Sequence, residues 1–300
     1  MAVRGSLRNN SSARPIGAHG SPAAPAIPRG AVDSHVHVFD ALRFPFDSAS
    51  PYTPQPHEAG TVGDLTRLLD AHAFQRVVIV NPTSGYGLDT RCLYDALSQL
   101  GSRARGITRV PIDIDRRKLR ALAVRRVIGV RLDVVAEGLT SVAGKLEPLL
   151  RRLADEGMVL DIQCEGDQLA ALLPELTRVP VRIVVDHIGR PVPARGLQQP
   201  GFAALLALAD TGRAAVKLSG AMRCSQQPPP WGDVDVYVAA LAARYGRDRL
   251  MFGSDWPFLR SPCRADFAPL LVQLARWFPV AADRRRILVD TPAAWFGFEE

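Results

Sequence analysis

From residue 31 onward, short apolar runs alternate with longer stretches in which apolar residues recur every three or four positions. Short runs rich in Val, Ile and Leu are typical of buried strands, and the three- to four-residue recurrence is typical of amphipathic helices. The predicted strands are Val32–Val38, Arg76–Val80, Arg105–Val110, Val127–Leu132, Met158–Cys164, Arg182–Val185, Ala214–Leu218 and Leu250–Gly253. The predicted helices are Val62–His72, Arg91–Gln99, Asp115–Val124, Leu146–Glu156, Phe202–Ala209, Val234–Tyr245 and Ala265–Trp277, with a helical tail at Arg284–Phe296.

This alternation predicts a single α/β domain over residues 31–298. Eight strand–helix units favour a (β/α)8 TIM barrel, and an open doubly wound sheet is the alternative. Neither a Gly-x-Gly-x-x-Gly motif nor a phosphate-binding loop follows a predicted strand, so the pattern does not indicate nucleotide binding. Residues 1–30 are rich in Ser, Ala, Pro, Gly and Arg without hydrophobic periodicity, and we expect them to form a flexible arm rather than a secretory signal.

Composition narrows the class of protein and its partners. The 300 residues, 47% of them hydrophobic, can bury a large core, and no apolar segment approaches the roughly 20 residues of a membrane span. The four cysteines lie far apart, which favours free thiols in the cytoplasm. The net charge of +7 comes from scattered arginines, so we expect no nucleic-acid partner. The expected partner is a small-molecule substrate, and the expected assembly is a monomer or a small homo-oligomer.

The first predicted strand contains two histidines, His35 and His37, separated by a single residue. Side chains alternate along a strand, so both imidazoles should point to the same side. Imidazole is a common metal ligand and general acid or base, and the pair therefore indicates a reaction centre. The alternative is a pair of histidines that merely fall in an amphipathic strand or a tag.

Catalytic residues of a barrel lie at the C-terminal ends of its strands. Polar residues end or follow the predicted strands at these points: His35 and His37, Thr83, Arg131, Gln163 and Glu165, Asp186, His187 and Arg190, Lys217, Ser219 and Arg223, and Asp255. We expect these side chains, far apart in the sequence, to converge on one mouth of the barrel.

Three segments carry a family resemblance: VDSHVH at 32–37, VDHIGRP at 185–191 and FGSDWP at 252–257. In this order they resemble the amidohydrolase-2 family of the amidohydrolase superfamily, and within it the lactonases typified by 2-pyrone-4,6-dicarboxylate lactonase. The resemblance runs from about Pro28 to Phe298. It implies a (β/α)8 barrel that hydrolyses the ring ester of a small carboxylated lactone.

Within that resemblance, Asp255 is the candidate base that activates water. The imidazoles of His35, His37 and His187 are candidates to polarise the carbonyl group or to orient the water. The alternative for Asp255 is a helix N-cap before Pro257. The alternative for His187 is a buried structural imidazole.

A carboxylated substrate calls for the planar, bidentate donors of arginine. Arg131, which lies in a predicted strand, and Arg223 are the candidates. Tyr52 is a candidate to close the pocket with its hydroxyl group, with a surface aromatic as the alternative. The remaining candidates for substrate binding are Gln163, Thr83 and Arg190, with a structural ion pair as the alternative for Arg190.

Metal-binding members of the superfamily use a bridging carboxylated lysine and further histidines, but this chain has Arg131 and Gln163 on the corresponding strands. The lactonases that the chain resembles work without a metal, so we expect no cofactor. A single zinc ion held by His35, His37 and Asp255 is the alternative. We also expect Asp161, which shares strand parity with Gln163, to pair with Lys217 or Arg131.

Three positions depart from the lactonase pattern. Gln163 replaces a tyrosine, Ala136-Glu137 replaces a second arginine, and Phe258 replaces a histidine. These changes remove donors for a second carboxylate, so a lactone with one carboxylate, such as a sugar-acid lactone, fits these residues as well as a dicarboxylate does. The resemblance also leaves two alternative activities, a lactone isomerase and a zinc-dependent decarboxylase of the same superfamily.

Overall fold

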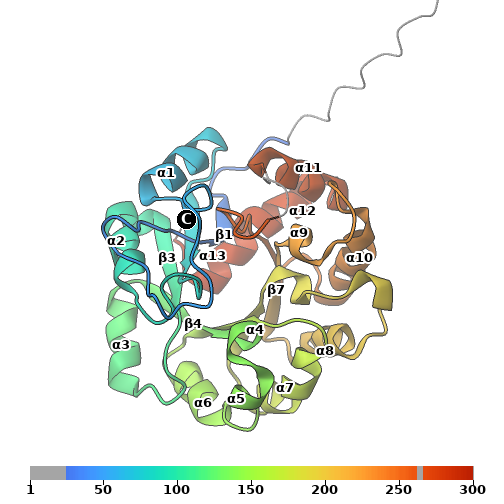
Figure 1. Cartoon of the computed structure of the whole chain (residues 1–300). Coiled ribbons are helices and arrows are strands. Elements are labelled where there is room, and N and C mark those ends of the chain that lie inside the picture. Colours follow the sequence, from blue (N-terminus) through green and yellow to red (C-terminus); the bar gives the residue numbers. More distant parts are fainter. Residues whose placement is uncertain (1–24, 262–265, 300) are drawn as a thin grey trace, which may run out of the picture.

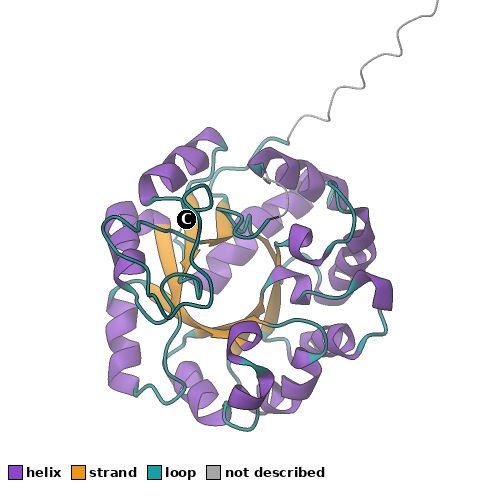
Figure 2. Cartoon of the chain, viewed as in Figure 1, coloured by secondary structure: helices purple, strands orange, loops and turns teal. Residues whose placement is uncertain are grey.

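In a computed structural model that describes residues 25–261 and 266–299, the described chain forms eight parallel strands in the order β1 to β8. The strands are β1 (Val32–Val36), β2 (Arg76–Val80), β3 (Ala104–Thr108), β4 (Val127–Asp133), β5 (Val159–Gln163), β6 (Arg182–Val185), β7 (Ala214–Leu218) and β8 (Leu250–Phe252). Figure 2 shows them as a ring with helices outside it, so the predicted barrel is confirmed.

Helices surround the ring, and α13 (Thr291–Phe296) lies across one end of the barrel (Figure 1). The helices are α1 (Val62–Ala71), α2 (Arg91–Leu100), α3 (Arg116–Val124), α4 (Val134–Glu137), α5 (Leu139–Val142), α6 (Glu147–Asp155), α7 (Gln168–Arg178), α8 (Pro200–Leu208), α9 (Ala221–Cys224), α10 (Asp235–Tyr245), α11 (Phe267–Trp277), α12 (Ala281–Arg285) and α13 (Thr291–Phe296). Local sequence sets where they start: Thr61 and Asp64 form a capping box at α1, and Asp115 caps α3.

The ring closes between β1 and β8 through a short parallel bridge of Val36 and Trp256. The His37 N–H donates to the Trp256 carbonyl at 2.8 Å, and the Asp255 N–H donates to the His35 carbonyl at 2.8 Å. The backbone segments that carry the predicted base and the predicted histidine pair are therefore hydrogen-bonded to each other.

The interior of the barrel changes character along its axis. An apolar cluster that Trp295 and Phe296 of α13 complete fills part of it: Val32, Val78, Val80, Ile107, Val159, Val184, Ala215 and Met251. On some strands the residue two positions further along is polar, as in the steps from Val159 to Asp161 and from Ala215 to Lys217, and both polar residues are completely buried. Because strand side chains alternate, these polar positions form a layer at the C-terminal ends.

The sequence pattern missed the eleven-residue helix α7, between β5 and β6, and the four-residue helices α4, α5 and α9. Pro174 lies inside α7, and a proline, which lacks an N–H, ordinarily marks the end of a helix. Leu169, Leu172 and Leu176 are buried, so apolar packing against the barrel outweighs the lost hydrogen bond. The tail predicted as one helix, Arg284–Phe296, is not a continuous α-helix, because the π-helical segment Arg286–Asp290 separates α12 from α13.

The predicted arm, residues 1–30, lies almost wholly outside the described residues, which begin at Pro25. None of the helices in the described ranges combines the length and the apolar character that crossing a bilayer requires. The predicted free thiols are confirmed for Cys92, Cys164 and Cys224. The fourth cysteine, Cys263, lies outside the described residues.

Candidate active site

A cavity of about 840 Å³ opens at the C-terminal ends of the strands. Most of the predicted site residues line it: His37, Thr83, Arg131, Gln163, His187, Arg190, Arg223 and Asp255. His35 lies beneath it and is completely buried. A larger cavity of about 1160 Å³ lies between the N-terminal ends of the strands and the C-terminal segment, and no predicted site residue lines it. The chemistry indicated by the sequence therefore belongs to the smaller cavity.

Asp255 follows β8 in a left-handed backbone conformation, with φ of +64°. Aspartate tolerates this conformation better than most residues. The N-cap alternative for Asp255 is wrong, because the next described helix, α11, begins only at Phe267. Oδ2 of Asp255 accepts a hydrogen bond from Nε of Arg223. Oδ1 is buried and has no hydrogen-bond partner among the described residues.

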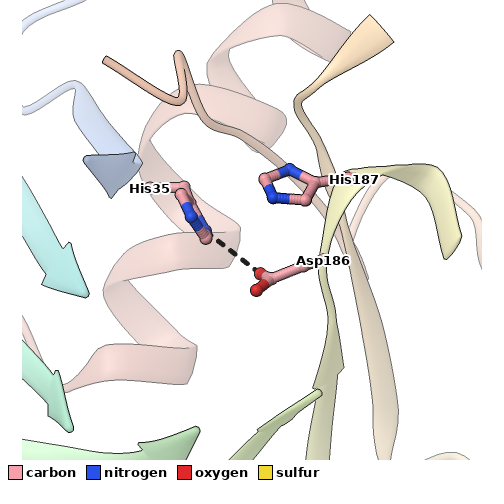
Figure 3. A group of neighbouring side chains, drawn as sticks. All are labelled: His35, Asp186 and His187. Carbon is pink, nitrogen blue, oxygen red and sulfur yellow. Dashed lines mark hydrogen bonds and ion pairs between the residues drawn. The ribbon is translucent and has the colours of Figure 1, made fainter. Parts of the chain in front are cut away.

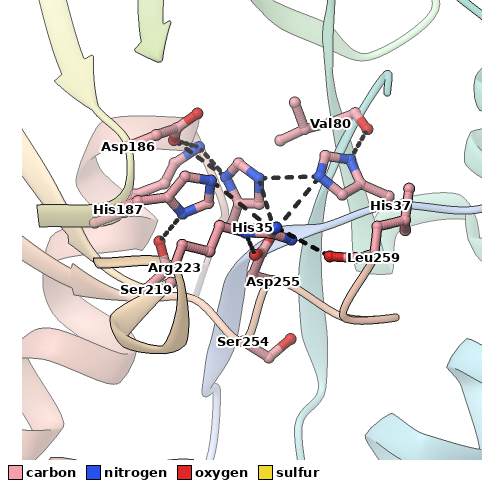
Figure 4. Close-up of polar contacts among 12 residues, drawn as sticks. His35, His37, Val80, Asp186, His187, Ser219, Arg223, Ser254, Asp255 and Leu259 are labelled. Carbon is pink, nitrogen blue, oxygen red and sulfur yellow. Dashed lines mark hydrogen bonds and ion pairs between the residues drawn. The ribbon is translucent and has the colours of Figure 1, made fainter. Parts of the chain in front are cut away.

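Three imidazoles surround this free oxygen of Asp255 (Figure 4). The Nε2 atoms of His37, His35 and His187 lie 3.6, 3.7 and 4.0 Å from Oδ1. The Nε2 atoms of His35 and His37 are 3.3 Å apart, as expected for two side chains on one side of a strand. The predicted meeting of residues from the first, sixth and last strands is confirmed.

The other partners of the strand-one imidazoles limit where their protons lie. Nδ1 of His37 lies 2.8 Å from the Val80 carbonyl oxygen, so it must donate, and Nε2 of neutral His37 is an acceptor. Nδ1 of His35 lies 3.1 Å from Oδ1 of Asp186 (Figure 3) and 3.2 Å from Nζ of Lys217. An ammonium group only donates and a carboxylate only accepts, so His35 has two self-consistent tautomers.

In the first tautomer Lys217 donates to Nδ1 of His35, and the Nε2–H of His35 points toward His37 and Asp255. In the second tautomer, the Nδ1–H of His35 donates to the Asp186 carboxylate. The Nε2 lone pairs of His35 and His37 and Oδ1 of Asp255 then all point toward the same position. The distances of 3.3 to 3.7 Å among those three atoms are close to the roughly 3.3–3.5 Å between ligands of a tetrahedral zinc ion. The set His35, His37 and Asp255 therefore fits a single divalent ion.

Beneath His35 lies a completely buried cluster of charged side chains. Nζ of Lys217 contacts Asp161 and lies 3.0 Å from Oδ1 of Asp186, so the predicted pairing of Asp161 is confirmed. Arg131 lies 3.5 Å from the other oxygen of Asp186. Burial and the neighbouring Asp186 raise the pKa of Asp161 to about 7. At Asp186 burial opposes ionisation, but His35 and Lys217 outweigh it and hold the pKa well below its usual value.

The protonation of the cavity-facing groups follows from the same physics. At Asp255 burial opposes ionisation, but Arg223 and the imidazoles outweigh it, so the pKa lies well below its usual value. Burial lowers the pKa of His35 well below its usual value and the pKa of His187 to about 3. Near neutral pH the site therefore holds an ionised Asp255 carboxylate beside the neutral imidazoles of His35 and His187.

The backbone conformation after β6 places two predicted residues, His187 and Arg190, in the wall of the cavity. His187, Ile188, Gly189 and Arg190 all have left-handed φ values, of +54°, +60°, +75° and +45°. Such runs are rare outside glycine, and strain of this kind concentrates at functional sites. His187 Nδ1 lies 2.9 Å from the hydroxyl oxygen of Ser219, which orients the ring.

Gly220 leaves room for the ring of His187. Its φ is +62°, and a Cβ at this position would lie 2.7 Å from Nδ1 of His187. We therefore expect Gly220→Ala to displace the ring and to lower kcat by about 10²-fold, the usual cost of a misplaced catalytic group. Steady-state kinetics on the purified variant measures this.

The matched control is Gly212→Ala. Gly212 has a similar φ of +67°, but a Cβ there meets nothing within 4 Å. Both variants should lose about 1–2 kcal/mol of stability from the left-handed backbone, and only Gly220→Ala should lose activity. Equal kcat values for the two variants would contradict the role given to His187.

The three predicted arginines each face a carboxylate: Arg131 faces Asp186, Arg190 lies 3.0 Å from Glu165, and Arg223 contacts Asp255. Arg190 thus forms the ion pair given as its alternative. Arg223 also donates to the Leu259 carbonyl at 3.0 Å. Nε of Arg131 is buried and has no hydrogen-bond partner among the described residues, while the Arg131 side chain as a whole lines the cavity.

The uncharged candidates differ in their access to the cavity. Thr83 lines it and donates to Oδ2 of Asp133 at 2.5 Å. Gln163 lines it too. The hydroxyl group of Tyr52 donates to Glu58, and Tyr52 is not among the residues that line the cavity. Its predicted role as a hydroxyl donor to substrate gains no support from this position.

Two charged residues that line the cavity escaped the sequence analysis, Asp133 and Arg260. Asp133 shares strand parity with Arg131, so a stricter use of alternation would have found it. Arg260 lies in the irregular loop after β8 and has a left-handed φ of +53°. No periodic pattern in the sequence could have placed it.

Comparisons with known proteins agree with this geometry. A family model described as amidohydrolase matches residues 32–298. The 4-sulfomuconolactone hydrolase of Rhizobium radiobacter is 33% identical, over 93% of this chain and 94% of the relative. The 2-pyrone-4,6-dicarboxylate hydrolase of Comamonas testosteroni is 32% identical, over 91% and 92%. A Pseudomonas putida crystal structure assigned to 2-pyrone-4,6-dicarboxylic acid hydrolysis is 34% identical, with a TM-score of 0.80 over 91% of this chain and 100% of that one.

Proposed function

The chain belongs to the amidohydrolase family, and on that premise we propose that it hydrolyses the ring ester of a small carboxylated lactone. The observation that carries the proposal is the carboxylate of Asp255, whose Oδ1 is buried, ionised and without a hydrogen-bond partner among the described residues. An acceptor in this state, inside a cavity lined by arginines and imidazoles, suits the activation of a water molecule.

The first step is the attack of water. A water molecule donates one O–H to Oδ1 of Asp255, and its oxygen forms a bond to the carbonyl carbon of the lactone as the proton moves to the carboxylate. Arg223 holds Oδ2 through its Nε, so the carboxylate cannot rotate away from the water. Holding the base and the water in one geometry removes much of the entropic part of the activation barrier for the attack.

The carbonyl oxygen becomes an oxyanion in this step and needs a donor. We assign that donor to His187, which is neutral because burial lowers its pKa to about 3. When the Ser219 hydroxyl donates to Nδ1, at 2.9 Å, the proton of His187 is on Nε2, which faces the cavity. A preorganised donor in a site that excludes water stabilises developing charge more than a donor in bulk solvent does.

Ring opening completes the reaction. The tetrahedral intermediate collapses, the bond from the carbonyl carbon to the ring oxygen breaks, and the ring oxygen takes the proton that Asp255 accepted. The low pKa of Asp255 favours this return. The products are a carboxylate and a hydroxyl or keto group in one open chain, and Asp255 is ionised again for the next turnover.

Arg131 is proposed to hold the carboxylate of the substrate. It is 4% exposed, and its side chain lines the inner wall of the cavity. A guanidinium forms two parallel hydrogen bonds with a carboxylate, which orients the lactone as well as attracting it. Thr83 and Gln163, on the same wall, are proposed to bind the ring substituents.

A divalent ion held by His35, His37 and Asp255 would polarise the carbonyl group or acidify the water. The tautomer in which Lys217 donates to His35 satisfies the same residues without an ion. We therefore expect the activity to survive exhaustive treatment with a chelator. Metal analysis of the same sample before and after treatment checks this, and loss of activity with loss of one zinc per chain would contradict it.

The test of the function is a panel of lactones supplied to the purified protein: 4-sulfomuconolactone, 2-pyrone-4,6-dicarboxylate and several sugar-acid lactones. In water enriched with ¹⁸O, hydrolysis places one ¹⁸O in the new carboxylate and releases one proton per turnover. A lactone isomerase would give a new ring without ¹⁸O, and a decarboxylase would release carbon dioxide. Absence of ring opening across the panel would refute the proposal.

A further inference from the structure

Arg260 differs from the other arginines that line the cavity. Arg131, Arg190 and Arg223 each face a carboxylate. The guanidinium of Arg260 forms no ion pair with any residue in the described part of the chain, although its side chain lines the same cavity. Its positive charge is therefore available to a ligand.

Neighbouring side chains hold the guanidinium of Arg260 in position. The Arg260 guanidinium carbon lies 4.0 Å from the centroid of the Tyr52 ring, in cation–π contact. The Tyr52 hydroxyl group donates to Oε2 of Glu58, which also accepts the Gln55 N–H at 2.9 Å. Oε1 of Glu58 accepts the backbone N–H of Arg260 at 2.8 Å. Glu58, 9% exposed, thus holds both the aromatic ring and the backbone of Arg260.

This arrangement suits the binding of an oxyanion. A guanidinium resting on an aromatic ring still presents its N–H donors outward in one plane, and these match a carboxylate or a sulfonate. The support also limits the side-chain entropy that a free arginine loses when it binds a ligand. The Tyr52 hydroxyl group is already bound to Glu58, so Tyr52 contributes the face of its ring and not a donor.

The topology separates Arg260 from Arg131. Arg131 lies on β4, and Arg260 lies in the loop that follows β8. In a ring ordered β1 to β8, the fourth and eighth strands stand on opposite sides. The cavity therefore has two cationic groups on facing walls, with Asp255 after β8 and the imidazoles of β1 and β6 in the same cavity.

We propose that Arg260, supported by Tyr52 and Glu58, binds a second oxyanion group of the substrate, so that the preferred lactone carries two anionic substituents. This rests on the proposed function and adds to it the residue that binds the second anionic group. Gln163, Glu137 and Phe258 stand where the related lactonases have donors for a second carboxylate. Arg260, at the mouth of the cavity, supplies a different donor for that group. Arg260 is a specificity-determining residue, and Tyr52 is a positioning residue.

The experiment compares matched substrates that differ by one anionic group: 4-sulfomuconolactone against muconolactone, and 2-pyrone-4,6-dicarboxylate against 2-pyrone-6-carboxylate. The quantity measured is the ratio of kcat/KM values within each pair. Arg260→Met should lower the ratio about tenfold, the low end expected for a charge-assisted contact near solvent. Added salt should lower the ratio of the wild type and change that of the variant much less.

Three further variants separate binding from structure. Tyr52→Phe keeps the ring face and should retain most of the ratio, whereas Tyr52→Leu removes the ring face and should lower the ratio. Arg125→Gln is the matched control, since the Arg125 guanidinium lies over Tyr94, 4.8 Å from its ring centroid, away from the residues that line the cavity. Arg125→Gln should leave the ratio unchanged. The inference is overturned if Arg260→Met lowers both members of each pair by the same factor.

A binding measurement keeps the inference testable even if no lactone is hydrolysed. Titration calorimetry with isophthalate and with benzoate compares a dicarboxylate with a monocarboxylate of similar shape. Tighter binding of isophthalate that Arg260→Met abolishes would support the second anion position while the proposed function fails. Ring opening without any preference for the doubly anionic lactones would contradict the inference but not the proposed function.

Discussion

Asp255→Asn is expected to lower kcat by about 10³-fold on any lactone that the wild type opens, because an amide cannot take the proton from water. The change keeps the shape of the side chain, and its oxygen can still accept from Arg223. Binding should survive, so KM should change much less than kcat. Steady-state kinetics, together with a thermal melt to show that the fold is kept, measures this effect.

The control for Asp255→Asn is Asp210→Asn. Asp210 lies on the surface, where it pairs with Arg244 and its side chain is 62% exposed. That variant should keep wild-type kinetics. Because surrounding positive groups hold the pKa of Asp255 well below its usual value, the wild-type base should stay ionised down to the ordinary aspartate range near pH 4. Nearly full activity of Asp255→Asn would remove the base from the mechanism.

Lys217→Met is expected to cost about 3–5 kcal/mol of stability, the usual penalty for removing one partner of a buried ion pair. Lys217 is completely buried and is bound to both Asp161 and Asp186. Without the ammonium group these two carboxyls face each other with less compensation. Chemical denaturation followed by circular dichroism measures the loss.

The loss in Lys217→Met should depend on pH, with a definite sign. Burial raises the folded pKa of Asp161 to about 7 although Lys217 lowers it, so removal of Lys217 should raise this pKa further. The stability that protonated Asp161 contributes is fully present below its unfolded pKa, about 4, and is lost as the pH rises through the folded pKa. The variant should therefore be less impaired at pH 5 than at pH 8. Adding Asp161→Asn should recover part of the loss at pH 8.

A surface lysine provides the control for Lys217→Met. Lys118 is 67% exposed and lies 3.7 Å from Asp115 in an i, i+3 pair. Exposed pairs of this kind contribute little, so Lys118→Met should change stability by less than about 1 kcal/mol. Similar losses in the two variants would mean that the buried charge cluster does not act as described.

The sequence analysis was most accurate where one physical rule acts over several residues. Short apolar runs predicted all the strands to within two residues of their observed ends. Alternation along β1 predicted that His35 and His37 share a side, and their Nε2 atoms are 3.3 Å apart. Alternation along β5 also predicted the inward position of Asp161 and its pairing with Lys217 or Arg131, and the structure pairs it with Lys217.

The failures have particular causes. Helix α7 escaped because Pro174 reads locally as a helix end, whereas burial of its leucines decides the outcome. Tyr52 was assigned a donor role because a hydroxyl group near a pocket suggests one, but the structure gives that hydroxyl group to Glu58. Arg260 escaped because the loop that carries it has no periodicity.

The sequence by itself predicted the barrel and the end of it at which polar residues gather, because hydrophobic period and strand parity are local properties that repeat along the chain. The resemblance to the amidohydrolase-2 family then indicated Asp255 as the candidate base. Only the tertiary structure decided which charges are already compensated. The sequence alone does not distinguish the four arginines of the cavity, Arg131, Arg190, Arg223 and Arg260. Distance and burial, which depend on elements brought together from the whole chain, leave one of the four guanidinium groups without a carboxylate among the described residues.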